Sequence, residues 1–213
     1  MSLKLHVFPL SPRAFKVLWA ANHLGLDYHL SFIDLTKGHQ KREEFLALNP
    51  NGKMPVLEHD GFSLWESNAI VNYLAHLKPE KGLLPSELHA RMRVVQWQFW
   101  DSTSWDPACA SLVFERVVKR LLKIGEPSPA EIEKGEAKFA SAAQVLDGQL
   151  QKHRHVGGDK FTVADLSVGA ALNAADAAQY PLEPYRAIQR WHTELKAMPS
   201  WQATSALQAK RAA

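Results

Sequence analysis

Hydrophobic positions follow two different patterns along the chain. From residue 3 to about residue 77, short β-type runs alternate with segments of helical spacing. LKLHVF and YHLSFIDL predict strands, and AFKVLWAANHLGL between them predicts a helix that ends at Gly25. A polar stretch without a clear period follows, and then two short runs meet at Asp60-Gly61, a pair typical of two-residue hairpins. The helical run SNAIVNYLAHL completes the order βαβ, irregular, ββα.

From about Leu88 onward, every periodic segment is helical. The stretch KPEKGLLPSE, which contains proline and glycine, separates the two patterns. We therefore expect an α/β domain over residues 1–79 and an all-α domain over residues 88–213. The helices expected in the second domain cover residues 88–105, 108–124, 130–153, 162–178 and 184–198.

Composition and charge exclude several classes of function. The 213 residues are 46% hydrophobic and 22% charged, with a net charge of +3, as in an ordinary globular protein. Basic and acidic side chains alternate, so the sequence indicates no nucleic-acid partner. It contains no apolar run long enough to span a membrane, and MSLKLHVF does not resemble a secretory signal. We therefore expect a cytoplasmic protein without membrane contact.

The cysteine and histidine content limits the available chemistry. Cys109 is the single cysteine, which excludes an intrachain disulfide, a CxxC redox pair and a thiolate zinc site. The ten histidines form no HxxxH or similar cluster, so we expect no bound metal.

Ser11 is the first candidate for chemistry. It lies where a predicted strand gives way to a predicted helix, and α/β folds place ligands at such points because the first helical N–H groups are unpaired. The alternative is a helix N-cap, with Pro12 at the first helical position. The local sequence favours the cap.

Two further stretches carry candidate residues. In NPNGKMPVL, two turn dipeptides precede Pro55, which opens a strand; the local sequence does not by itself indicate a cis bond there. Glu66 and Ser67 follow a strand and open a helix, so they could hold an anionic group and an ammonium, although a plain N-cap is locally favoured. Thr162 and Asp165 predict a capping box with a structural role.

Three segments, in this order and spacing, resemble the cytosolic glutathione transferase family over essentially the whole chain. They are PLSPRAFKV, EFLALNPNGKMPVLEHDGFSLWESNAIVNYLAHL and FTVADLSVGAAL. Serine-type members, such as the phi and theta-like groups, are the most similar. The resemblance implies a thioredoxin-like first domain that binds glutathione as co-substrate, and a helical second domain that completes the pocket for an electrophile. It also implies a homodimer with a general role in detoxification.

The resemblance assigns roles around the glutathione sulfur. Ser11 occupies the position of the serine whose hydroxyl donates a hydrogen bond to the sulfur, and a neighbour such as Arg13 is the alternative contact. Pro55 matches the family's cis-proline. The backbone of Met54 would then bind the cysteinyl part of the tripeptide.

The two ends of the tripeptide have their own candidates. Glu66 and Ser67 match the pair that binds the γ-glutamyl end, and Lys53 should reach a carboxylate. Either His39 or Gln40 would hold the glycyl end. In the helical domain, Trp105 and Phe114 are the candidates for the electrophile pocket.

Two other interpretations remain. A non-catalytic member of the same fold would bind glutathione or another protein, and the presence of Ser11, Pro55, Glu66 and Ser67 favours the enzyme. Thiol transfer or dehalogenation by a cysteine-type relative is disfavoured, because no cysteine lies near residue 11.

Overall fold

The computed structural model describes residues 2–8 and 10–212 of the chain. Pro9, the first of the two prolines that flank Ser11, lies outside the described residues. The chain forms two compact units, one of Met1–Leu84 with Ala197–Ala213 and one of Pro85–Lys196. The described residues from Ala197 onward, which the sequence analysis grouped with the helical domain, therefore pack with the first unit.

A four-stranded mixed sheet forms the centre of the first unit. β1 runs parallel to β2 and antiparallel to β3, and β3 forms a hairpin with β4. The hairpin turns at Asp60 and Gly61, whose φ angles are +49° and +86°, as the sequence predicted. The strands, in the spatial order of the sheet, are β2 (His29–Phe32), β1 (Leu3–Val7), β3 (Val56–His59) and β4 (Phe62–Trp65).

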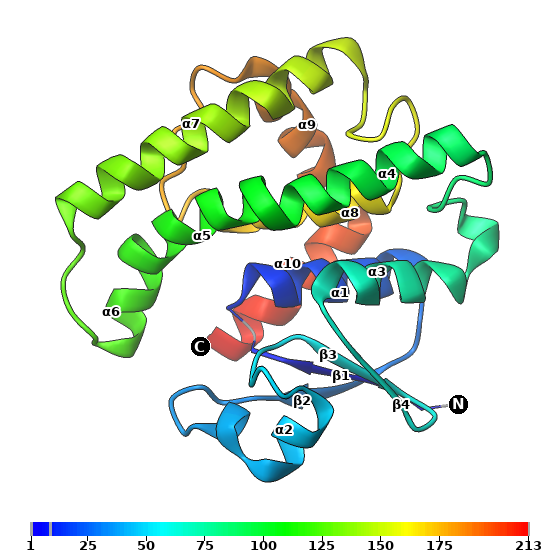
Figure 1. Ribbon diagram of the computed structural model, residues 1–213, viewed down its shortest axis with the longest axis vertical. Coiled ribbons are helices and arrows are strands. Elements are labelled where there is room, and N and C mark those ends of the chain that lie inside the picture. The colour runs from blue at the N-terminus through cyan, green and yellow to red at the C-terminus, as the bar shows by residue number, and fades with distance from the viewer. Residues whose placement is uncertain (1, 9, 213) are drawn as a thin grey trace. The chain divides into compact units, whose positions relative to one another are not determined.

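Helices cover the two faces of this sheet unequally. The longer helices α1 (Pro12–Leu24) and α3 (Ser67–His76) lie on one face, and the short helix α2 (Glu43–Leu48) lies on the other (Figure 1). The 3₁₀ turns His39–Lys41 (η1) and Pro79–Lys81 (η2) precede α2 and follow α3. The polar stretch that showed no clear period in the sequence thus forms η1 and α2.

Helix α10 (Pro199–Ala212) packs on α1 within the first unit. The ring of Trp201 contacts Phe15 and Trp19 edge-to-face, with centroids 4.6 and 4.8 Å apart. Trp19 Nε1 also donates a hydrogen bond to Ser200 Oγ at 3.1 Å. Burial of this aromatic cluster holds the end of the chain against the α/β unit.

The second unit is helical in all its described elements. A long run extends from α4 (Leu88–Trp100) through α5 (Asp106–Val113) to α6 (Lys119–Leu122), interrupted by the π-helical turns Asp101–Trp105 (η3) and Phe114–Val118 (η4). Pro107 lacks the N–H that a regular helix would require, and η3 ends two residues before it. The helix therefore continues where the sequence predicted a break. The remaining elements are α7 (Pro129–Lys152), α8 (Val163–Gly169), η5 (Ala170–Ala174) and α9 (Arg186–Ala197). No helix among residues 2–8 and 10–212 is long and apolar enough to cross a membrane.

The predicted capping box at the start of α8 is confirmed. Thr162 caps the helix, and the fully buried Asp165 accepts hydrogen bonds from the backbone N–H groups of Thr162 and Val156, each at 2.9 Å. Asp165 therefore also holds the loop before α8 in place through the N–H group of Val156. The sequence analysis did not predict this second role.

Trp201→Ala should lower the free energy of unfolding of the first unit by about 3–5 kcal/mol, the usual cost of removing a buried large aromatic side chain. Urea unfolding followed by circular dichroism measures the effect. Gln202→Ala, at the adjacent exposed position, is the matched control and should change stability little. Equal losses in the two variants would contradict the packing of α10 described above.

Asp165→Ala should cost about 2–4 kcal/mol, because it leaves two buried N–H groups without an acceptor. Thr162→Ala, which removes only the side-chain cap, should cost about 1 kcal/mol. The same urea titration compares the two variants. The assigned role of Asp165 is wrong if its replacement costs no more than that of Thr162.

Candidate functional site

Three chain reversals meet at one end of the sheet in the first unit. β1 ends at Val7, and the chain then enters α1 through Ser11. Val56, the first residue of β3, pairs with His6 on one side and with Trp65 on the other. Because both pairings are antiparallel, the residues just before β3 lie at the same sheet end as those just after β1 and β4. The sheet therefore brings Ser11, Pro55 and the Glu66-Ser67 pair to one edge.

The Ser11 side chain caps α1 only weakly. Its Oγ accepts a hydrogen bond from Ala14 N at 3.4 Å, which is longer than the usual N–H···O distance. A hydroxyl can accept and donate at once, and the cap uses only its acceptor capacity. Within the described part of the chain, the structure gives the Ser11 proton no acceptor. The half-buried hydroxyl is therefore able to donate to a ligand.

The turn before β3 is braced by a buried asparagine. Asn49 is 3% exposed; its Nδ2 donates to Lys53 O at 2.7 Å, and its Oδ1 accepts from Asn51 N at 3.0 Å. The Met54–Pro55 bond that follows is cis, as the family resemblance implies. Asn49 therefore holds the turn before β3 in position. The sequence analysis identified Asn49 only as part of a turn dipeptide.

Glu66 adopts an unusual backbone conformation at the start of α3. Its φ of +71° and ψ of 112° lie in a region that non-glycine residues rarely occupy. Glu66 occupies the N-cap position, as the local sequence allowed, but its side chain makes no capping hydrogen bond to the first turn of the helix. Ser67 is the first helical residue and is buried. Strained backbone of this kind is often found at ligand sites.

Lys16 is a buried charge that sequence reasoning missed. It is 3% exposed, and its Nζ donates to Asn68 Oδ1 at 2.9 Å, which ties α1 to α3 one turn beyond Ser11 and directly after Ser67. The available signal was a single lysine inside the otherwise apolar run from residue 14 to residue 21. A buried ammonium at this position adds positive potential near the start of both helices.

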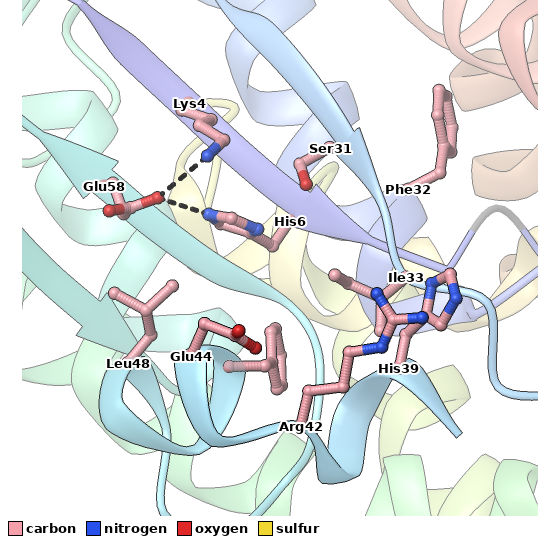
Figure 2. Close-up of a pocket in the computed structure, with 11 residues that line it drawn as sticks. Lys4, His6, Ser31, Phe32, Ile33, His39, Arg42, Glu44, Leu48 and Glu58 are labelled. Carbon is pink, nitrogen blue, oxygen red and sulfur yellow. Dashed lines mark hydrogen bonds and ion pairs between the residues drawn. The ribbon is translucent and has the colours of Figure 1, made fainter. Parts of the chain in front are cut away.

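His39 and Gln40, the two candidates for the glycyl end, occupy different surroundings. His39 lines a hollow of about 430 Å³ between the sheet and α2 (Figure 2). The Gln40 backbone oxygen lies against the turn before β3, 3.0 Å from the point where a side chain on Gly52 would begin. The Oε1 atom of Gln40 is buried and has no hydrogen-bond partner among the described residues. Gln40 therefore lies against Gly52, the residue that precedes Lys53.

The two candidates for the electrophile pocket also differ. Trp105 is fully buried in the second unit, where its ring contacts Trp100 and Phe139 and its Nε1 donates to Val168 O at 2.9 Å. These contacts make Trp105 a core residue and give it no free face for a ligand. Phe114, at the start of η4, is 45% exposed.

Cys109 is enclosed in the second unit and is unsuited to thiolate chemistry. It is 2% exposed, and burial, with a smaller contribution from Asp106, raises the pKa of its thiol well above the ordinary value. Across residues 2–8 and 10–212, no group of three or more histidine, cysteine, aspartate or glutamate side chains could hold a metal ion.

Sequence models of the N-terminal and C-terminal domains of glutathione S-transferase match residues 1–76 and 129–194. Glutathione S-transferase 3 of Zea mays is 35% identical over 96% of this chain and 93% of its own length. A crystal structure of a glutathione S-transferase from Pseudomonas fluorescens superposes with a TM-score of 0.84 at 34% identity, covering 94% of this chain and 97% of that one.

A third relative shows the fold alone. The structure of glutathione S-transferase-I bound with lactoylglutathione has a TM-score of 0.89 at 24% identity, covering 97% of this chain and all of that one. This structure and the Pseudomonas structure match the thioredoxin-like sheet and the helical segment seen here, and the maize relative matches in sequence. The chain therefore belongs to the glutathione S-transferase family of enzymes.

Proposed function

We propose that this enzyme binds glutathione at the sheet edge that carries Ser11, Pro55, Glu66 and Ser67, and adds its thiolate to hydrophobic electrophiles. The observation that carries the proposal is the Ser11 hydroxyl, which caps α1 through its oxygen and leaves its proton without an acceptor in the described structure. A sulfur anion facing this edge would accept a hydrogen bond from the Ser11 hydroxyl.

The energies of the groups at this edge are sufficient for the chemistry. A free thiol has a pKa of about 8.5, so only a few per cent is ionised at pH 7. Lowering this pKa by about two units requires roughly 2.7 kcal/mol of preferential stabilisation of the thiolate. A hydrogen bond to a charged group supplies about 1.5–3 kcal/mol, and the start of a helix adds about 0.3–1 kcal/mol.

The rest of the tripeptide finds complementary groups at the same edge. In this proposal the Met54 backbone binds the cysteinyl part, and Glu66 and Ser67 bind the γ-glutamyl end. Lys53, which is exposed, reaches a carboxylate. We assign the glycyl end to Gln40, because its backbone packs against the turn that carries Lys53.

The electrophile would bind against apolar side chains of the helical unit. Phe114 is our candidate, since it is exposed and Trp105 is not. We further propose that the enzyme is a homodimer, as the family resemblance implies. A panel of aryl halides, isothiocyanates and peroxides assayed with glutathione would define the range of electrophiles.

Ser11→Ala should lower kcat/KM for conjugation about 10- to 100-fold, the effect of losing one hydrogen bond to a charged group. The KM for glutathione should change much less, because the backbone and carboxylate contacts remain. The pKa of the bound thiol should rise by about one to two units. A pH titration of thiolate absorbance in the glutathione complex measures that pKa directly.

Ser86→Ala, an exposed serine in the segment between α3 and α4, is the matched control and should leave both rate and pKa unchanged. An unaltered thiol pKa in Ser11→Ala would overturn the role given to Ser11. Glutathione binding by the wild-type enzyme with no conjugation of any electrophile would favour the non-catalytic alternative.

Asn49→Ala should raise the KM for glutathione about 10-fold, because the three side-chain hydrogen bonds that shape the turn are lost, each of which contributes roughly 1 kcal/mol or less. Steady-state kinetics should show a smaller change in kcat. Asn49→Asp keeps the oxygen that Asn51 donates to and loses the donor to Lys53, so its KM should be intermediate. A fall in kcat at constant KM would contradict this positioning role.

A further inference from the structure

The Asn51-Gly52 pair carries a chemistry that the proposed function does not use. The chain has six asparagines, and only Asn51 is followed by glycine. Asparagine is a thermolabile residue, and a glycine after it exposes its side-chain amide to attack, because glycine has no side chain to shield the backbone nitrogen. Asn51 is exposed in the turn between α2 and β3. The pair is therefore a candidate for spontaneous modification.

The fold requires the glycine of this pair. Gly52 has a φ of +59°, a conformation that other residues rarely adopt. A side chain at this position would begin 3.0 Å from the backbone oxygen of Gln40. Replacement of Gly52 would therefore strain the turn, and only the residue at position 51 can vary freely.

Hydrogen bonds to Asn49 hold both reacting groups of the pair. Asn49 Oδ1 accepts from the backbone N and from Nδ2 of Asn51, each at 3.0 Å, and Gly52 N donates to Asn49 O at 2.9 Å. Gly52 N is the atom that would attack, and Asn51 Nδ2 belongs to the group that would leave. The turn must therefore open before they react. Exposed turns open at a lower free energy than a whole unit, so the folded enzyme can react slowly.

We propose that Asn51 is a site of spontaneous deamidation, which Asn49 restrains and which weakens the binding of glutathione. When the turn opens, Gly52 N attacks Asn51 Cγ. An N–C bond forms, the bond from Cγ to Nδ2 breaks, and the Gly52 amide proton leaves with the amide group as ammonia. Water then opens the succinimide ring at one of its two carbonyls and gives aspartate or isoaspartate. No electrons are exchanged, and water is the only co-reactant.

Both products disturb the turn. Aspartate at position 51 places a carboxylate oxygen where Nδ2 donated to Asn49 Oδ1, so that two acceptors face each other. Isoaspartate lengthens the main chain by one atom just ahead of Lys53 and Met54. The new negative charge also lies two residues from Lys53, which we assign to a carboxylate of glutathione. The loss of affinity rests on the glutathione site proposed above, whereas the modification itself does not.

Prolonged incubation of the full-length enzyme at mildly alkaline pH tests the modification. Ion-exchange chromatography and peptide mapping by mass spectrometry should show an acidic species that accumulates in step with released ammonia and carries aspartate and isoaspartate at position 51. The other asparagines should remain intact. Asp60-Gly61 and Asp147-Gly148 can form the same ring, but they release water and leave the charge unchanged, so they do not contribute to the acidic species.

The restraint by Asn49 is tested by comparing rates. Asn49→Ala should deamidate at position 51 about tenfold faster, because the side-chain bonds to Asn51 are lost. Asn173→Ala, in η5 of the second unit, is the matched control and should leave the rate unchanged. S-methylglutathione, which has no reactive thiol, should slow the wild-type reaction about tenfold at about ten times its Kd, because it binds only the closed turn. This protection tests the same restraint if Asn49→Ala does not fold.

Asn51→Asp reproduces one product and should raise the KM for glutathione about fivefold with little change in kcat, the effect of one lost hydrogen bond. Asn51→Ser is the matched control, because it cannot deamidate and adds no charge. It should form no acidic species and change the KM much less. Steady-state kinetics measures both variants.

Three results would overturn the proposal. They are an intact Asn51 in the folded wild type while the urea-unfolded chain deamidates, equal rates in the wild type and a folded Asn49→Ala, and an unchanged KM in Asn51→Asp. Chromatography and peptide mapping of the incubated enzyme use no glutathione. A failure of the proposed glutathione site would therefore leave the measured modification standing, and the two failures are distinguishable.

Discussion

The antiparallel pairing of β3 with both β1 and β4 is the constraint on which the candidate glutathione site depends. Val56 pairs with His6 and with Trp65, and this register fixes which loops share one edge of the sheet. A slip of one residue would turn every β3 side chain to the opposite face and expose Leu57, which is fully buried. The core that stabilises the fold thus also determines which polar residues meet.

Ser11 shows how one side chain can serve structure and chemistry together. A strong cap would hold its oxygen close to the backbone, whereas the 3.4 Å contact with Ala14 leaves the group loosely held. α1 does not depend on that cap, because Pro12 starts the helix and burial of Phe15 and Trp19 against α10 holds it in place. The hydroxyl can therefore be oriented by a ligand at little cost to stability.

Much of the fold could be predicted from the sequence, because local signals determined it. The hairpin at Asp60-Gly61, the C-cap at Gly25 and the box at Asp165 each depend on a few adjacent residues. Helix α10 was not predicted, because its weakly amphipathic sequence is stabilised by long-range contacts of Trp201.

The candidate site was less accessible to sequence reasoning. Local patterns at Ser11 and at Glu66-Ser67 favoured plain caps, and only the order of motifs along the whole chain indicated a ligand site. The role of Lys16 could not be inferred, since its partner Asn68 lies 52 residues away. For Trp105, spacing alone did not distinguish a pocket wall from a core residue, and burial decides in favour of the core.

The two faces of β1 explain why a hollow lies between the sheet and α2 in the first unit. Leu3, Leu5 and Val7 are buried on the face covered by α1 and α3, where most of the apolar area of the strand is lost from water. Lys4 and His6 point to the other face, which the six residues of α2 cover only in part. Because the packing of α1 and α3 stabilises the sheet from one side, the other side can tolerate a hollow and the buried Nδ1 atom of His6, which has no hydrogen-bond partner among the described residues.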